Sequence, residues 1–168
     1  MGIVGFGRIG RHVGEIAAAV GMLVVAADES QKICPTGQAS VGAMSMNLMS
    51  ASDVVSLHCP LLPSTRGMMN AETLSRMKPG SILINTWRGT LVVEQHLANA
   101  LNDGHLAGGV DVLSSEPPPL DNPLLHAKNC IITPHIAWAT KEACMRLIES
   151  AAANLRAFLE GLPVNVVN

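Results

Sequence analysis

Three glycines near the N-terminus have the spacing that a loop needs to hold a pyrophosphate. Gly5, Gly7 and Gly10 form the pattern G-x-G-x-x-G directly after the apolar residues 2–4. The first glycine permits a tight turn, the second lets the backbone approach a phosphate, and the third lets a helix pack against the strand. The N–H groups and the dipole at the start of that helix favour an anion. The segment therefore predicts a dinucleotide site, and the alternative is a strand–helix turn without a ligand.

The helix that follows the glycines supports this prediction. It starts within the loop at Arg8 and Ile9, has apolar residues at helical spacing, and ends at Gly21. A glycine loop that joins an apolar strand to an amphipathic helix is the context that the phosphate-binding turn requires. The predicted buried face of the helix comprises Ile9, Val13, Ile16, Ala17 and Val20.

An acid stands where a dinucleotide site needs one. Residues 22–27 form a second apolar strand, and Asp28 at its end lies 18 residues after Gly10. An acid at about this separation meets the ribose hydroxyls of the adenosine half of the cofactor. Residues 29–32 contain no arginine that could accept the additional phosphate of NADP. We therefore predict NAD as the cofactor.

Apolar segments alternate with helical segments along the rest of the chain. This alternation predicts an α/β fold, a doubly wound Rossmann-type parallel sheet of about six strands with helices on both faces. A length of 168 residues favours a single domain. The predicted strands are residues 2–4, 22–27, 53–57, 81–85, 106–113 and 130–133, and the predicted helices after the first are residues 41–50, 71–77, 94–102 and 140–160.

Four polar residues follow the predicted strand ends, beyond which ligands bind in such a sheet. They are His58, Arg88, Glu116 and His135. Arg88 offers a planar fork for a carboxylate, His135 can donate a proton near neutral pH, and Glu116 can hold its tautomer. With a nicotinamide, these three predict the reduction of a 2-keto acid. Taken singly, each has another explanation: a structural histidine, a surface ion pair or a solvated loop acid.

The predicted cofactor contacts are the residues at the glycine loop and at the strand ends. Thr86 and Trp87 belong to this group because they directly follow the strand 81–85. The full set comprises Gly5, Gly7, Arg8, Ile9, Gly10, Asp28, His58, Thr86, Trp87, Arg88 and His135.

Composition excludes several classes of protein. Aromatic residues make up only 2% of the chain, so the core must be aliphatic, and a net charge of −2 argues against a nucleic-acid surface. The longest apolar run, residues 16–27, has 12 residues and is too short to span a bilayer. We see no signal peptide.

The cysteines show no C-x-x-C pair, which favours free thiols, a reducing cytoplasmic compartment and no metal site. They are Cys34, Cys59, Cys130 and Cys144.

The chain resembles the NAD-binding domain of the D-isomer-specific 2-hydroxyacid dehydrogenases. Within that family, residues 132–140 and 162–168 are most similar to the branch that interconverts hydroxypyruvate and D-glycerate. The resemblance implies a 2-hydroxy or 2-keto acid substrate and a homodimer that pairs through this domain. The similar stretches are residues 2–10, 52–60, 77–89, 104–117 and 131–140.

The resemblance also implies roles for individual residues. It repeats the roles given above to Arg88, Glu116 and His135. It adds Asp111 as a contact to the nicotinamide amide and Trp138 as a substrate-side or cross-subunit residue. It places three further residues near the ribose and phosphates of the cofactor: Cys59, Pro60 and Thr65.

The sequence departs from the family pattern in three respects. The family carries a substrate domain built largely from residues that precede the glycine motif, whereas this chain begins at the motif. Trp87 replaces a small residue beside the nicotinamide, where it could crowd the ring or shift Arg88. Val93 replaces an acid, and residues 31–50 are atypical. We expect residues 1–140 to form the NAD-binding domain and residues 141–168 a helix and tail that face the substrate domain.

These departures leave three functions open. A chain without the substrate domain is expected to bind the cofactor and to turn over slowly or not at all, because nothing closes the site. A non-enzymatic NAD-sensing scaffold is the second possibility, since corepressors resemble this family. A degenerate, truncated copy is the third.

Overall fold

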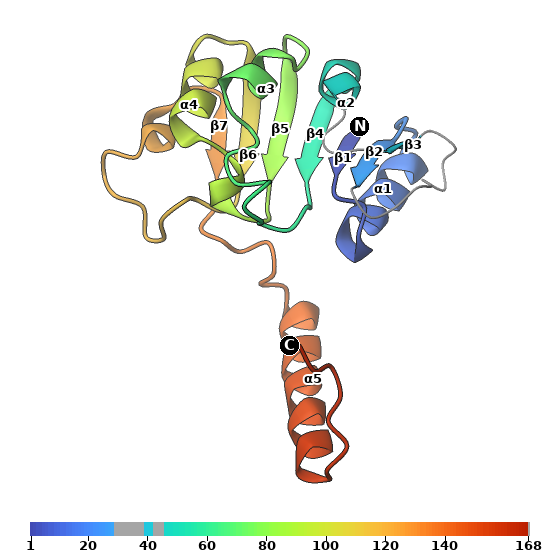
Figure 1. The fold of residues 1–168 in the computed structure, drawn as a ribbon. Helices are drawn as coiled ribbons and strands as arrows, with labels where there is room; N and C mark the ends of the chain where they lie inside the picture. The colour runs from blue at the N-terminus through green and yellow to red at the C-terminus, as the bar shows by residue number, and fades with distance from the viewer. Residues whose placement is uncertain (29–38, 42–45, 168) are drawn as a thin grey trace. The chain divides into compact units, whose positions relative to one another are not determined.

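The computed structural model describes residues 1–28, 39–41 and 46–167, which form two compact units, Met1–Pro134 and His135–Asn168 (Figure 1). The first unit holds every strand that is described. Its elements are β1 (Gly2–Val4), α1 (Arg8–Ala19), β2 (Val25–Asp28), β3 (Ala39–Val41), α2 (Met46–Ala51), β4 (Val54–Leu57), α3 (Ala71–Ser75), β5 (Ser81–Asn85), η1 (Gly89–Leu91), α4 (Glu94–Asn102), β6 (Leu106–Val110), η2 (Pro123–His126) and β7 (Cys130–Ile132).

The described strands form one parallel sheet of seven strands in the order β3-β2-β1-β4-β5-β6-β7. The chain runs outward from β1 to β3 and then returns to β4 beside β1. The strand order therefore reverses between β1 and β4, and a crevice beyond the carboxyl ends of these two strands is where such sheets bind ligands. The predicted Rossmann-type fold is confirmed, with one strand more than the six expected.

The additional strand, β3, lies in the segment for which the sequence pattern was weakest. Of the helix predicted over residues 41–50, the structure contains α2 at Met46–Ala51. Residues 42–45 lie outside the described part of the chain. Elsewhere β1, β5 and α4 have the predicted bounds, and the remaining predicted elements are present with ends that differ by a few residues.

Side chains alternate between the two faces of the sheet, as the period of a strand requires. In β1, Ile3 joins a small cluster under α1 that includes Phe6 and Ala17. Val4 points into a larger cluster that α2, α3 and α4 cover, with Leu74 and Leu97 among its buried members. The described core is therefore almost entirely aliphatic, as the composition predicted.

The predicted buried face of α1 is only partly correct. Ala17 is buried and Val13 is half-buried, as predicted. Ile9, Ile16 and Val20, in contrast, are 50%, 66% and 73% exposed, and Gly10 and Gly14 are buried in their place. A Cβ on Gly14 would lie 3.1 Å from the Ile3 side chain. The helix approaches β1 so closely that its smallest residues must face the sheet, and this turns the large apolar residues outward.

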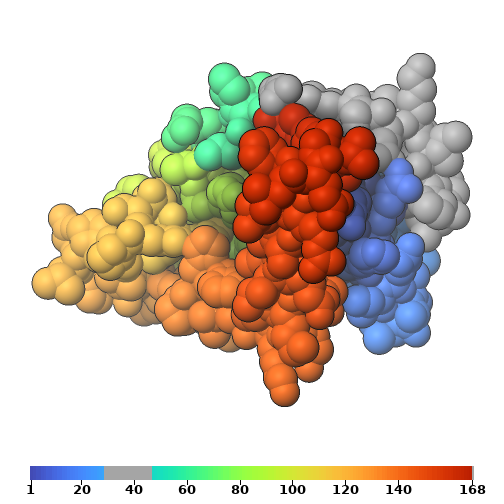
Figure 2. Space-filling view, turned by 90° about the horizontal axis from the view of Figure 1, so that it is seen from below, coloured from blue at the N-terminus to red at the C-terminus, as the bar shows by residue number. Residues whose placement is uncertain are grey.

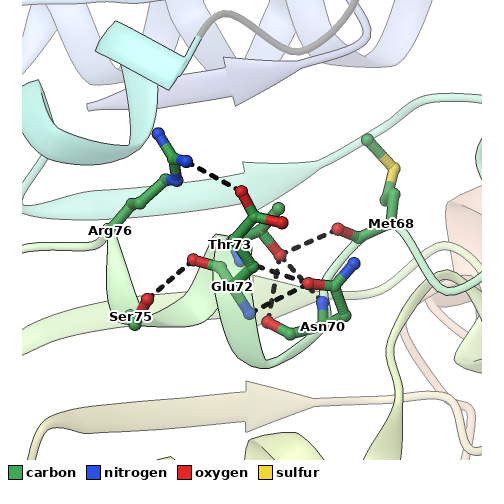
Figure 3. Close-up of polar contacts among 6 residues, drawn as sticks. All are labelled: Met68, Asn70, Glu72, Thr73, Ser75 and Arg76. Atoms are coloured by element: carbon green, nitrogen blue, oxygen red, sulfur yellow. Dashed lines mark hydrogen bonds and ion pairs between the residues drawn. The ribbon is translucent and has the colours of Figure 1, made fainter.

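A capping box at Asn70 fixes the start of α3 (Figure 3). The Asn70 side chain accepts hydrogen bonds from the N–H groups of Glu72 and Thr73, at 3.0 and 3.3 Å. In return, the Thr73 hydroxyl accepts from the Asn70 N–H at 2.8 Å. These bonds satisfy N–H groups that a helix start leaves open, which lets a helix of five residues form.

The second unit is built on α5 (Lys141–Leu159), which Thr140 caps through its hydroxyl. The tail folds back along α5, where Asn165 donates to the Asn154 side chain at 2.8 Å.

In the first unit, the proline-rich loop after β6 projects at one edge of that unit (gold in Figure 2). No helix among the described residues is long and apolar enough to cross a bilayer.

Candidate active site

The glycine loop is pressed against the end of β4. Gly5 has a φ of +92°, and a Cβ at this position would lie 2.4 Å from the Cys59 nitrogen. A Cβ on Gly10 would lie 2.1 Å from the carbonyl oxygen of Gly5. Only glycine fits at these two positions, because the clashes are with backbone atoms that cannot move aside. The loop is thus held at the point where the strand order reverses.

Gly7 differs from its two neighbours and provides the test of whether a dinucleotide fits. A Cβ on Gly7 would meet no atom within 4 Å, so the space above it is open. Gly7 is also the N-cap of α1, and no side chain caps this helix. Uncapped N–H groups beside open space suit a pyrophosphate. These residues therefore fit the predicted cofactor.

The Asp28 carboxylate is tied to the same loop. Its Oδ2 accepts a hydrogen bond from the N–H of Phe6 at 2.6 Å. This bond spans from the end of β2 to the turn after β1 and places the acid beside the glycines, as the sequence predicted. A carboxylate there can accept hydrogen bonds from two ribose hydroxyls.

His58, at the end of β4, is buried rather than open to a ligand. Its Nε2 lies 2.9 Å from the Ser56 hydroxyl, and its Nδ1 has no hydrogen-bond partner among the described residues. Burial lowers the pKa of His58, because the charged imidazolium loses its hydration. A cofactor contact of this side chain stays a prediction.

Burial of His58 predicts a loss of stability in acid. The unfolded chain binds a proton near the ordinary pKa of 6.5, while the folded chain binds it only at a lower pH. Stability therefore falls as the pH drops below 6.5, by at most about 1.4 kcal/mol per pH unit for this one proton. We expect urea unfolding between pH 5 and pH 8 to show that the free energy of unfolding depends less on pH in His58→Gln than in the unchanged chain. Parallel profiles would contradict the prediction.

The turn that carries Arg88 is clamped by Asn85, which is 1% exposed. The Asn85 side chain accepts from the Trp87 N–H at 3.1 Å and donates to the Arg88 carbonyl at 2.9 Å. A Cβ on Gly89 would lie 2.1 Å from the carbonyl carbon of Leu113. The Arg88 turn therefore packs directly on the segment after β6, which leads to Glu116.

Removal of the Asn85 clamp should loosen this turn. Asn85→Ala leaves the Trp87 N–H and the Arg88 carbonyl without their partner, at a cost of about 1–3 kcal/mol in unfolding free energy. Asn85→Asp keeps the acceptor for the Trp87 N–H but buries a charge and places a carboxylate oxygen where the donor to the Arg88 carbonyl was, so it should be no more stable than alanine. Denaturant unfolding of the three proteins measures this order. Equal stabilities would mean that the clamp is dispensable.

The Glu116 carboxylate is held by its own loop, where it accepts from the Leu113 N–H at 3.1 Å. Glu94, at the start of α4, anchors the same loop. It accepts from the N–H and hydroxyl of Ser114, at 2.6 and 2.8 Å, and from the Asn122 side chain at 2.9 Å. Glu116 thus leaves the sheet edge on a loop with a fixed base.

Asp111 is 4% exposed and accepts a short hydrogen bond from the Thr133 hydroxyl. This bond joins the ends of β6 and β7. At the end of β4, the Thr65 hydroxyl donates to the Pro60 carbonyl at 2.7 Å and accepts from the Leu62 N–H at 2.8 Å. Asp111, Cys59, Pro60 and Thr65 therefore lie in ordered segments at the ligand-binding edge, while their cofactor contacts stay predictions.

His135 belongs to the second unit, and so does Trp138. The backbone of His135 has a φ of 54°, in the left-handed region. The indole of Trp138 donates to the His135 carbonyl at 2.8 Å. A non-glycine residue in this conformation is uncommon and is found more often at functional sites. The pairing of His135 with Glu116 stays a prediction.

Sequence reasoning missed Asn85 and Glu94. Asn85 was included only as the last residue of a strand, and Glu94 only as the start of a helix. The signal for Asn85 was a polar residue at the buried end of an apolar strand, which needs partners. No group of three metal-binding side chains lies among the described residues, and no disulfide joins Cys59, Cys130 or Cys144 there.

These features define a class of protein, and the comparison with known families identifies it. Residues 1–137 match the model of the D-isomer specific 2-hydroxyacid dehydrogenase, NAD binding domain. The chain belongs to this family and contains its NAD-binding domain.

Several relatives are similar over nearly the whole chain. A hydroxypyruvate reductase from Blautia hydrogenotrophica is 52% identical over 100% of this chain, and a glycerate dehydrogenase from Methylorubrum extorquens is 43% identical over 99%. The chain spans about half the length of these relatives, 52% of each.

Solved structures agree with this assignment. A D-lactate dehydrogenase with NAD+ from Lactobacillus jensenii has a TM-score of 0.87 and 31% identity, over 99% of this chain and 54% of that one. An acyclic imino acid reductase in complex with NADPH and D-Arg has a TM-score of 0.90 and 34% identity, over 99% of this chain and 53% of that one.

Proposed function

We propose that this chain is the NAD(H)-binding part of an oxidoreductase that transfers hydride between NAD(H) and a small 2-hydroxy or 2-keto acid, with hydroxypyruvate and D-glycerate as the pair. The observation that carries the proposal is the glycine loop: Gly5 and Gly10 are locked against backbone, while open space lies above Gly7. The substrate rests on the similarity to a hydroxypyruvate reductase and a glycerate dehydrogenase.

In the proposed reaction, each of these residues has a separate role. The bound nicotinamide supplies the hydride. The backbone around Gly7 binds the pyrophosphate, and Asp28 orients the ribose. Arg88 binds the substrate carboxylate and polarises the adjacent carbonyl. We assign proton donation to the carbonyl oxygen to His135, with Glu116 fixing its tautomer and keeping it basic enough to work near neutral pH.

Asp28 supports a preference for NAD over NADP. Its carboxylate is beside the glycine loop, where the phosphate of NADP would meet a negative charge. Residues 29–32 offer no arginine to compensate. Titration of the purified chain should therefore give a lower Kd for NADH than for NADPH, and tighter binding of NADPH would overturn this preference.

Turnover tests the catalytic half of the proposal. Hydroxypyruvate added to the chain with NADH should oxidise the cofactor slowly, because closure over the substrate is needed to exclude water. The experiment compares absorbance at a fixed NADH concentration with and without hydroxypyruvate. Oxidation at the rate of an ordinary dehydrogenase would contradict the expectation of an open site, and NADH binding without any oxidation would mean that this part holds the cofactor but does not complete the reaction by itself. Absence of NADH binding would remove the proposal as a whole.

We further propose a cytoplasmic homodimer that binds no nucleic acid. Large apolar side chains on the outer face of α1, including Ile16 and Val20, are more than half exposed and suit a protein partner. Scattered free thiols suit a reducing compartment. Light scattering of the purified chain should give twice the monomer mass, and a monomer at micromolar concentration would contradict the dimer.

A further inference from the structure

Trp87 has a contact that the proposed roles do not use. The Arg88 guanidinium carbon lies 5.5 Å from the centre of the Trp87 ring, in cation–π geometry. The Arg88 Nη1 also donates to the Trp87 carbonyl at 2.7 Å. Two separate parts of Trp87 thus hold the same guanidinium.

The indole can hold Arg88 because Trp87 is itself fixed. Its side chain is half-buried and packs against the larger core, and its backbone N–H donates to the Asn85 side chain. Arg88, in contrast, is exposed, and within the described part of the chain the hydrogen bond and the cation–π contact of its side chain are both with Trp87. An exposed arginine otherwise samples many rotamers, and ordering it upon binding costs up to about 2 kcal/mol.

We propose that Trp87 is a positioning residue that holds the Arg88 guanidinium in the orientation in which it binds a substrate carboxylate. The inference rests on the proposed role of Arg88 in binding that carboxylate. The guanidinium carbon lies over the ring, and the bond to the Trp87 carbonyl occupies one N–H of Nη1. The edge formed by Nε and Nη2 remains as the planar fork for two carboxylate oxygens.

This role gives a function to Trp87, the large residue that the family resemblance places beside the nicotinamide. The indole supplies a flat, weakly hydrated surface on which a guanidinium stacks well. A leucine at position 87 would fill similar apolar space without a ring face, and a phenylalanine would keep a smaller ring. Trp87→Leu and Trp87→Phe therefore separate stacking from packing.

The direct test is nuclear magnetic resonance of the full chain labelled with nitrogen-15. The Arg88 Nε–H signal is assigned by its loss in Arg88→Lys, and the exposed Arg66 serves as the internal reference. We expect Arg88 Nε to be rigid in the unchanged chain, nearly as rigid in Trp87→Phe, and as mobile as Arg66 in Trp87→Leu. Equal rigidity in all three proteins would overturn the inference. This readout requires neither cofactor nor turnover.

A binding experiment connects the ordering to the substrate. Oxalate, a planar dicarboxylate, is titrated into the chain saturated with NADH. Trp87→Leu should raise the Kd for oxalate by about two- to fivefold relative to Trp87→Phe, the range that an exposed cation–π contact supports. Equal Kd values for the two variants would contradict the inference.

The two experiments distinguish this inference from the proposed function. If NADH binds but Arg88 is rigid without the ring, the role of Trp87 is wrong and the proposed function stands. If Arg88 depends on the ring but no NADH binds, the proposed function is wrong and the ordering of Arg88 by Trp87 stands.

Discussion

Replacement of Gly7 with aspartate is expected to leave the chain folded and to remove most of its affinity for NADH. Aspartate is a good N-cap, and its side chain at this position meets no atom within 4 Å, judged from the Cβ. The same open space is where the pyrophosphate must lie. A carboxylate about 4 Å from a phosphate charge costs about 4 kcal/mol at an effective dielectric constant near 20, or about 10³-fold in Kd.

Two other substitutions control this experiment. Ala71→Asp adds the same charge at the first residue of α3, away from the glycine loop, and should leave the Kd for NADH unchanged. Gly10→Ala places a Cβ 2.1 Å from the Gly5 carbonyl oxygen, so it should lower stability as well as binding. Calorimetric titration with NADH and thermal unfolding separate the two effects. Normal NADH binding by Gly7→Asp would mean that the cofactor does not pass over this loop.

The strands of the sheet were predictable because each is a short apolar run with polar residues at its end. β5 was predicted with its observed bounds for this reason. β3 was not, because residues 39–41 have no apolar run and pair only with β2 at the sheet edge. An edge strand needs little burial, so it leaves little trace in the sequence.

The prediction for the buried face of α1 failed at Ile9, Ile16 and Val20 for a related reason. Hydrophobic periodicity assumes that the largest apolar residues face the core. Here the close approach of α1 to β1, set by Gly10 and Gly14, leaves no room for them. The correct signal was the spacing of the small residues, which recurs every three to four positions from Gly10 to Ala17.

The candidate site was predictable only in part. Chemistry-bearing residues at strand ends, such as Asp28, could be found because the topology places strand ends together. Asn85 and Glu94 bind no ligand in our assignment. Glu94 accepts from the Ser114 N–H, 20 residues away, and this partner depends on how two segments meet, which local sequence patterns do not encode. Asn85 instead bonds the Trp87 N–H and the Arg88 carbonyl within its own turn, so its signal was local.

Replacement of Arg88 should abolish binding of the carboxylate while sparing the cofactor loop. Arg88 presents the fork at the end of β5, on a turn fixed by Asn85 and Gly89. Hydrogen bonds to a charged group contribute about 1.5–3 kcal/mol each, so loss of the fork in Arg88→Ala should raise the Kd for oxalate at least about 10²-fold. The measurement is oxalate titration of the NADH-saturated protein, followed by the fluorescence of bound NADH.

Arg88→Lys determines whether the charge or the fork is responsible. Lysine keeps the positive charge but binds a carboxylate as a point charge, without two parallel hydrogen bonds and without stacking on Trp87 as a plane. Its Kd for oxalate should therefore lie between those of arginine and alanine, nearer to alanine. A lysine variant that binds oxalate as tightly as the unchanged chain would show that Coulombic attraction alone suffices, and that neither the fork nor its orientation by Trp87 matters for binding.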